Sequence, residues 1–276
     1  MTAMQATPTP TESAAPARRP WAGGWRSAYA TARGLRHAAN EDCCLHAPSA
    51  DAPAFCAVAD GVGGGAFGEV ASHALARHCA AAPPEIRRDP ARLAAWVKQG
   101  DAVVREAIAR RGDRPGASTL AAAWLFPWGR VWLSHIGDCR AYRLRRRWRG
   151  QGWHIERLTV DQTYANLGRT PPPGGSPDDP ARMAGVGAAG EPPVRRVWLW
   201  PGDLLLLCSD GLHKFVDDTA LAELVGEGLR QGLDLRELCG RLVDAALAGG
   251  SQDDVSALLV RRRPWPPALP IFGKPE

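Results

Sequence analysis

Four aspartates lie at the boundaries of apolar segments in this chain: Asp60, Asp138, Asp210 and Asp253. The first three end such segments, and Asp60 and Asp210 precede glycine directly. Asp60 follows the apolar run 55–59, and four of the next five residues are glycine. A carboxylate at the end of a buried strand is unfavourable unless a positive partner meets it, and glycines let the backbone approach such a partner closely. Taken alone, each aspartate also fits an ordinary turn with a capping side chain.

The repetition of this pattern predicts a shared site. If the strands share a sheet, or lie in facing sheets, their ends can bring several carboxylates together. Clustered carboxylates repel one another and stay ionised only with cations between them. A ligand set made of oxygens, without histidine, favours Mg²⁺ or Mn²⁺ over zinc. Two such ions suit phosphoryl chemistry, because they activate a water and bind phosphoryl oxygens.

A short polar loop before the first of these aspartates contains Arg36 and the acidic pair Glu41–Asp42. An arginine beside two carboxylates is most often a surface ion pair. The alternative is an anion-binding arginine next to metal-binding acids, because a guanidinium makes a bidentate contact with phosphate. The sequence leaves both interpretations open.

The elements that must position these residues follow from the hydrophobic pattern. The apolar run 204–208 has no alternation, which predicts a strand buried on both faces. The helical spacing in 90–111 is interrupted at Gly100 and predicts one long helix or two shorter ones. Strands are predicted at 25–31 (an edge strand), 43–47, 55–59, 120–126, 130–136, 141–145, 153–158, 194–200, 203–208 and 255–260, and helices at 68–82, 90–111, 217–226 and 233–248.

Composition limits the class of protein. The chain has 276 residues, enough for a sizeable core, and a formal net charge of +5. Its seven cysteines have no paired metal-type spacing, so a reducing compartment is expected. No stretch approaches the roughly 20 apolar residues that cross a bilayer, and the N-terminus lacks a signal peptide's apolar core. We therefore expect a cytoplasmic protein, with a disordered leader at 1–24 and a proline-rich tail at 263–276.

Eight short motifs follow one another along the chain. They are Arg36…Asn40-Glu41-Asp42, Ala59-Asp60-Gly61-Val62-Gly63-Gly64, Gly68-Glu69-Val70-Ala71-Ser72, Gly116-Ala117-Ser118-Thr119, Gly137-Asp138-Cys139-Arg140-Ala141-Tyr142, Leu158-Thr159-Val160-Asp161-Gln162, Ser209-Asp210-Gly211-Leu212 and Gly250-Ser251-Gln252-Asp253-Asp254-Val255-Ser256. In this order they resemble bacterial PPM-type (type 2C) metal-dependent Ser/Thr protein phosphatases, over about residues 26–261.

The resemblance implies an α+β fold, a four-layer α/β/β/α sandwich of two mainly antiparallel sheets flanked by helices, in a phosphatase domain at 25–262. Residues 164–193, rich in proline and glycine, are expected to form a mobile surface insertion that serves as a flap beside the active site.

Carried over by position, the resemblance implies a binuclear Mn²⁺ or Mg²⁺ centre. Asp60 would bridge the two ions, and Gly61 would offer its carbonyl to one of them. Asp210 and Asp253 would ligate the other ion. Glu41 would reach a metal directly or through water.

The resemblance also implies the rest of the machinery. Asp138, together with Asp210, would hold the third ion seen in bacterial members, so two or possibly three ions are expected. Arg36 would bind the substrate phosphate, which makes Arg36, Asp60 and Asp210 the expected catalytic residues. A metal-bound hydroxide would attack phosphorus in line with the serine or threonine oxygen that leaves.

Four features depart from the family pattern. Arg36 is one residue farther from the acidic pair than in most bacterial relatives, and Cys139 replaces a common serine. Asp254 stands where an asparagine usually follows the last metal-binding aspartate. Val62 stands where animal members carry a histidine proposed as general acid, so the sequence names no group that protonates the leaving oxygen.

The expected partners are phosphoproteins modified on serine or threonine, with a Ser/Thr kinase as the opposing enzyme, and the protein is expected to be monomeric. No nucleic acid and no membrane is expected among its partners. One alternative is a phosphatase-fold regulator that binds phosphoproteins and turns them over weakly or not at all. The intact set Asp60, Asp210 and Asp253 argues against it. A second alternative is a nucleic-acid-binding protein that uses the arginine-rich stretch 143–149.

Overall fold

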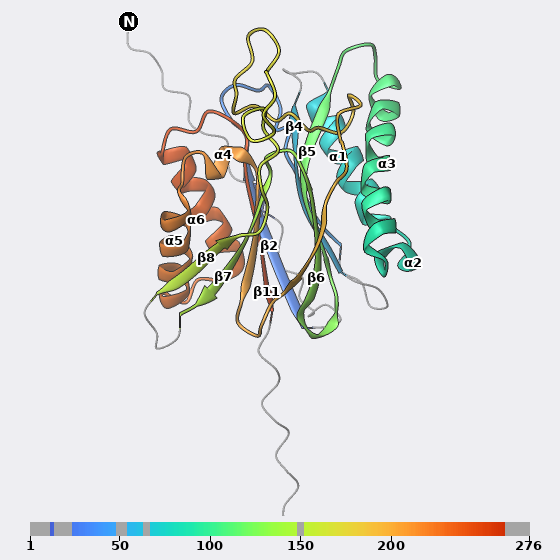
Figure 1. Ribbon diagram of the computed structural model, residues 1–276. Helices are drawn as coiled ribbons and strands as arrows, with labels where there is room; N and C mark the ends of the chain where they lie inside the picture. Colours follow the sequence, from blue (N-terminus) through green and yellow to red (C-terminus); the bar gives the residue numbers. More distant parts are fainter. Residues whose placement is uncertain (1–11, 14–23, 48–53, 63–66, 148–151, 263–276) are drawn as a thin grey trace, which may run out of the picture.

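The computed structural model describes residues 12–13, 24–47, 54–62, 67–147 and 152–262. Two β-sheets face each other, and helices cover the outer face of each, so that four layers are stacked (Figure 1). This arrangement confirms the predicted α+β sandwich. The predicted tail and nearly all of the predicted leader lie outside the described residues. Within the described chain, every helix is too short or too polar to cross a lipid bilayer.

The first sheet brings the N-terminal and C-terminal parts of the domain together. All its described pairings are antiparallel. Strand β2 pairs along its whole length with β11 and is also bonded to the two-residue strand β1, so it is not the edge strand that we predicted. The strand order is β1 (Glu12–Ser13), β2 (Trp25–Ala32), β11 (Val255–Arg262), β10 (Leu204–Cys208), β7 (Arg140–Arg146) and β8 (Trp153–Arg157).

The second sheet holds the strand that carries Asp60. Its described pairings are also antiparallel. Strands β5 and β6 form the predicted hairpin around Pro127–Gly129. The strand order is β3 (Cys43–Ala47), β4 (Ala54–Val62), β5 (Ala117–Leu125), β6 (Arg130–Ile136) and β9 (Val194–Trp198).

Helices form the two outer layers. The interrupted spacing around Gly100 belongs to one continuous helix, α3 (Pro90–Ala109). A Cβ at Gly100 would lie 2.6 Å from Cδ1 of Leu75 in the neighbouring helix α1 (Gly68–Ala80). A glycine there permits close packing of the two helices. The short helices at 84–87 and 210–213 were not predicted from the sequence, because a helix of about one turn is too short to show a hydrophobic repeat. The described helices are α1 (Gly68–Ala80), α2 (Pro84–Arg87), α3 (Pro90–Ala109), α4 (Asp210–His213), α5 (Asp218–Arg230) and α6 (Leu235–Ala248).

Three apolar layers separate the four structural layers. Alternate residues of β4 point to opposite sides, so Cys56 and Val58 pack between the sheets while Ala57 and Ala59 pack under the helices α1 and α3. The leucines of β10 divide in the same way between the inter-sheet core and the layer under α5 and α6. Their complete burial confirms that this strand is covered on both faces.

The segment 164–193 contains no helix and none of the named strands. Its second half is held against the domain, since Ala184 forms a β-bridge with Ser118, and Oδ1 of Asp101 accepts hydrogen bonds from the amides of Gly185 and Gly187. Its first half, residues 164–179, forms a separate loop, here called the excursion, which is closed by a β-bridge between Thr163 and Pro180. The two halves therefore differ in how closely they are tied to the sandwich.

Candidate active site

The predicted site residues meet at one end of the sandwich, and Asp60 is at the centre. The sequence placed Asp60 at the end of a strand, but β4 continues to Val62, and Asp60 lies opposite Thr119 in the register of β4 and β5. Burial raises the pKa of Asp60 well above its usual range, and the negative charges of Asp210, Asp42, Asp138 and Asp253 raise it further. These carboxylates come from distant segments, and the fold places them close enough for their charges to act on Asp60.

Asp138 lies in the tight turn between β6 and β7. Gly137 has φ +83°, and a Cβ there would lie 2.5 Å from the methyl group of Thr119, so this turn requires glycine. The side chain of Asp138 is only 3% exposed, and neither of its carboxylate oxygens accepts a hydrogen bond from the described residues. Burial and the charge of Asp210 raise the pKa of Asp138 to about 7, although Lys214 lowers it.

Asp210 is the first residue of α4, directly after the buried strand β10. Its Oδ2 accepts a 2.6 Å hydrogen bond from Nζ of Lys214, which also lies 3.8 Å from Oδ2 of Asp138. The repeated pattern of acidic residues in the sequence did not point to Lys214. Its spacing of four residues from Asp210 on a helical turn was the signal that could have done so.

Asp253 lies at the rim of the site, and its side chain is 34% exposed. Burial and the charge of Asp210 raise the pKa of Asp253. Gly34 lies against it so closely that a Cβ at position 34 would be 2.3 Å from the Asp253 backbone. The loop that carries Arg36 is therefore pressed against the last aspartate of the set.

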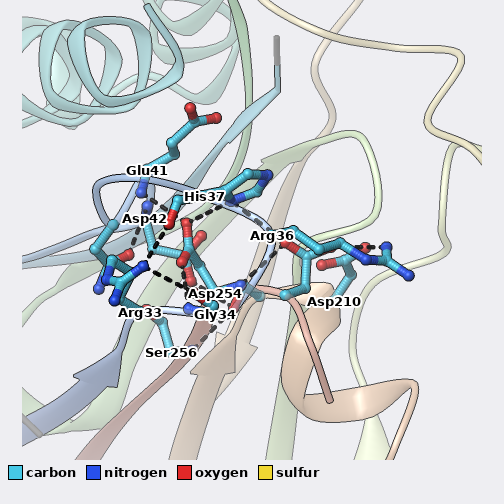
Figure 2. Close-up of polar contacts among 12 residues, drawn as sticks. Arg33, Gly34, Arg36, His37, Glu41, Asp42, Asp210, Asp254 and Ser256 are labelled. Carbon is cyan, nitrogen blue, oxygen red and sulfur yellow. Dashed lines mark hydrogen bonds and ion pairs between the residues drawn. The ribbon is translucent and has the colours of Figure 1, made fainter. Parts of the chain in front are cut away.

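Asp254 organises that loop (Figure 2). Its Oδ1 accepts a hydrogen bond from the amide of Gly34, and its Oδ2 accepts one from the amide of Glu41, each at 2.7 Å. Nδ1 of His37 lies 3.0 Å from the same Oδ2. The departure from the family's asparagine thus places a second acidic residue behind the loop, where both carboxylate oxygens are used.

Glu41 and Gly61 lie side by side at the start of α1. A Cβ at Gly61 would be 2.7 Å from the Glu41 carbonyl oxygen, and one at Gly68 would be 2.2 Å from Oε2 of Glu41. Glycine at both positions leaves room for the buried Glu41 side chain between β4 and α1. The neighbouring Asp42 is also buried; its Oδ2 accepts a hydrogen bond from Oγ of Ser209.

Arg36 is the exposed member of the set. Its side chain is 65% exposed, and one guanidinium nitrogen lies 4.0 Å from Oδ2 of Asp253. The contact is long, and the guanidinium remains open to solvent beside the carboxylates. The structure is therefore compatible with both interpretations of Arg36. The residue lies near an acidic side chain, as in a surface ion pair, and its guanidinium can still bind an anion.

The donor set suits a hard divalent cation. It is made of carboxylates and a backbone carbonyl, which Mg²⁺ and Mn²⁺ prefer. Three buried carboxylate oxygens accept no hydrogen bond from the described residues: both of those of Asp138, and Oδ1 of Asp42. In the described part of the chain, no three histidine, cysteine, aspartate or glutamate side chains stand close enough to enclose an ion. Ion binding would therefore draw these carboxylates inward.

The arginine-rich stretch on which the nucleic-acid alternative depends is partly engaged within the protein. Arg143 forms an ion pair with Glu156 on the neighbouring strand β8. Arg145 lies 3.2 Å from the buried carboxylate of Asp203. Arg146 and Arg147 are exposed, and residues 148 and 149 lie outside the described chain. Two of the arginines therefore form ion pairs within the protein, which weakens the case for this stretch as a nucleic-acid surface.

Comparison with known proteins agrees with this geometry. A family model described as protein phosphatase 2C matches residues 33–245. The serine/threonine protein phosphatase PstP of Mycobacterium tuberculosis is 32% identical over 247 residues, which cover 85% of this chain and 44% of that protein. The chain thus spans less than half the length of this curated relative.

Two solved structures extend the comparison. PppA, described as a key regulatory component of T6SS in Pseudomonas aeruginosa, has a TM-score of 0.68 and 28% identity, covering 86% of this chain and 97% of its own. The catalytic domain of the serine/threonine phosphatase PstP in complex with two manganese ions has a TM-score of 0.65 and 31% identity, covering 87% and 99%.

Proposed function

Since the chain belongs to the protein phosphatase 2C family, we propose that it is a metal-dependent protein serine/threonine phosphatase. Its substrates would be phosphoserine and phosphothreonine residues of proteins. The observation that carries this proposal is the proximity of Asp60 to Asp210, Asp138 and Asp253, since burial and the negative charges of these neighbours raise the pKa of Asp60. Divalent cations would relieve the repulsion among these carboxylates.

The residues divide into ligands and a substrate-binding group. Asp60 and the carbonyl of Gly61 would hold one ion, with Glu41 beside them, and Asp60, Asp210 and Asp253 would hold the other. When bound, the two ions would lower the pKa of a water that attacks phosphorus and would bind the phosphoryl oxygens.

Arg36 would orient the substrate. Its open guanidinium beside Asp253 can donate two parallel hydrogen bonds to a phosphate monoester. Asp254 would position Arg36 and Glu41 through the loop that it anchors.

The setting of the protein is part of the same proposal. A protein phosphatase would oppose a Ser/Thr kinase and act as a monomer on phosphoproteins in signal transduction. All seven cysteines are free thiols, which supports a reducing compartment such as the cytoplasm. We further propose that the phosphatase domain covers residues 25–262, with 164–193 as its flap.

The direct experiment measures hydrolysis of p-nitrophenyl phosphate and of a phosphothreonine peptide, with Mn²⁺, with Mg²⁺ and with excess EDTA after dialysis. We expect turnover that requires the ion and is lost in EDTA. Asp60→Asn should be inactive, and Asp244→Asn on the exposed face of α6 serves as the matched control. Undiminished turnover in EDTA would refute the metal mechanism, and tight phosphopeptide binding without turnover would favour the regulator.

A further inference from the structure

We propose that the ammonium group of Lys214 takes the place of a third divalent cation between Asp138 and Asp210, so that this protein binds two metal ions and not three. The inference rests on the proposed function, because it concerns the same metal site. Lys214 Nζ lies 2.6 Å from Oδ2 of Asp210 and 3.8 Å from Oδ2 of Asp138. These are the two carboxylates to which the family resemblance assigns a third ion.

The need for a positive charge here comes from Asp138. Its side chain is almost completely buried and accepts no hydrogen bond from the described residues. A buried carboxylate in that condition is strongly unfavourable unless a cation compensates it. Arg140, the next residue but one, is engaged by the carboxylate of Asp161 through three contacts of 2.6 to 3.1 Å. Lys214 is therefore the cation that faces Asp138.

The local fold holds Lys214 in this position. Helix α4 starts at Asp210, and the amide of Lys214 donates to the Asp210 carbonyl, which turns the lysine stem back over the first residue of the helix. Nε2 of His213 lies 3.0 Å from the carbonyl oxygen of Asp138. Because a carbonyl only accepts, this nitrogen carries a proton and donates. The bond ties the Asp138 turn to α4, so both partners of Lys214 are fixed relative to it.

The ammonium group contacts Asp210 and lies near Asp138, the two carboxylates that a third ion would share. A divalent ion bound to both carboxylates would lie about 2.1 Å from their oxygens, in the space that the lysine nitrogen now occupies. Such an ion would have to displace the ammonium group, and the two positive charges would then repel each other.

The experiment counts bound Mn²⁺ by the electron paramagnetic resonance signal of the free ion during titration. We expect two ions for the wild-type protein, and a third, weaker ion for Lys214→Ala and for Lys214→Met, which keeps the apolar stem. Lys98→Ala, which removes a lysine paired with Glu191 on the surface, should bind two. The double variant Lys214→Ala/Asp138→Asn should return to two, because the gained ion needs Asp138.

A second readout is the thermal stability of the metal-free protein. Lys214→Ala should melt several degrees below the wild type, since the repulsion between Asp138 and Asp210 is then unopposed, and Mn²⁺ should raise its melting temperature more than that of the wild type. Three ions in the wild type, or an unchanged count in both lysine variants, would overturn the inference while leaving the phosphatase proposal intact. A wild-type protein that binds no ion would refute both.

Discussion

The carboxylate of Asp254 accepts a 2.7 Å hydrogen bond from the amide of Glu41, a residue 213 positions earlier in the chain. The same side chain accepts a hydrogen bond from the amide of Gly34, so one residue directly before β11 fixes both ends of the loop that carries Arg36. The position of the proposed phosphate-binding group therefore depends on a residue that need not touch metal or substrate.

Replacing Asp254 tests this dependence. Asp254→Ala leaves two buried amides without their acceptor, which should cost about 1–3 kcal/mol of unfolding free energy and weaken Mn²⁺ binding. Asp254→Asn retains one acceptor oxygen and should lie between alanine and wild type on both measures. Urea unfolding and Mn²⁺ titration provide the data. If alanine and asparagine behaved alike and like the wild type, the loop would be held by other contacts.

Neutralising the central carboxylates separates catalysis from folding. Asp60→Asn and Asp210→Asn should each lower turnover by at least about 100-fold, as expected for loss of charge at a transition-state site. Both should keep the fold, and without metal their melting temperatures should equal or exceed that of the wild type because a repulsive charge is gone. Circular dichroism melts and phosphatase assays measure the two effects. A variant with near wild-type turnover would show that the site is misplaced.

The metal-free protein should lose stability as pH rises. Burial and Asp210 raise the pKa of Asp138 to about 7 in the folded state, above the roughly 3.9 of an unfolded aspartate. Between these values the folded state binds more protons than the unfolded one, so the unfolding free energy falls with increasing pH. Asp138→Asn should flatten this slope between about pH 4 and 7. Urea midpoints across that range measure it, and equal slopes in both proteins would contradict the assignment.

Arg36 should act on substrate and not on metal. Arg36→Ala removes a charge-assisted contact and should lower kcat/KM by about 10- to 100-fold, with Mn²⁺ binding unchanged. Arg36→Lys should recover part of the loss, because lysine keeps the charge but not the fork-shaped pair of donors. Arg92→Ala, at an exposed pair with Asp89 on α3, is the matched control. Weakened Mn²⁺ binding in Arg36→Ala would instead make Arg36 a structural partner of Asp253.

The excursion closed by Thr163 and Pro180 can be shortened without touching the anchored half of the segment. Replacing residues 166–178 by a short glycine linker should reduce rates on phosphopeptides much more than on p-nitrophenyl phosphate, whose small leaving group needs no flap. Assays on both substrates decide the outcome. Equal losses would mean that the excursion supports the metal site, and no change would mean that it is only a surface loop.

Local patterns were enough to predict most of the elements. The alternation and apolar runs that produce β3, β5, β6, β7 and β10 depend on neighbours within a few residues, and each strand was found to within a few positions. The errors have tertiary causes. Gly100 interrupts the helical pattern but not the helix, because Leu75 fills the space beside it. β4 runs past Asp60 because Ser118 and Thr119 extend the ladder opposite it.

The site shows the same dependence on tertiary structure. Asp60, Asp138 and Asp210 end apolar segments and Asp253 precedes one, and this repeated position at segment boundaries predicted a carboxylate cluster from the sequence alone. Only the fold determines which charged residues contact this carboxylate cluster, because the burial of each side chain and the distances between them depend on segments far apart in the chain. Lys214 turns toward Asp138 as well as Asp210 because His213 ties the Asp138 turn to α4. Asp254 anchors the Arg36 loop because β11 pairs with β2, which leads into that loop.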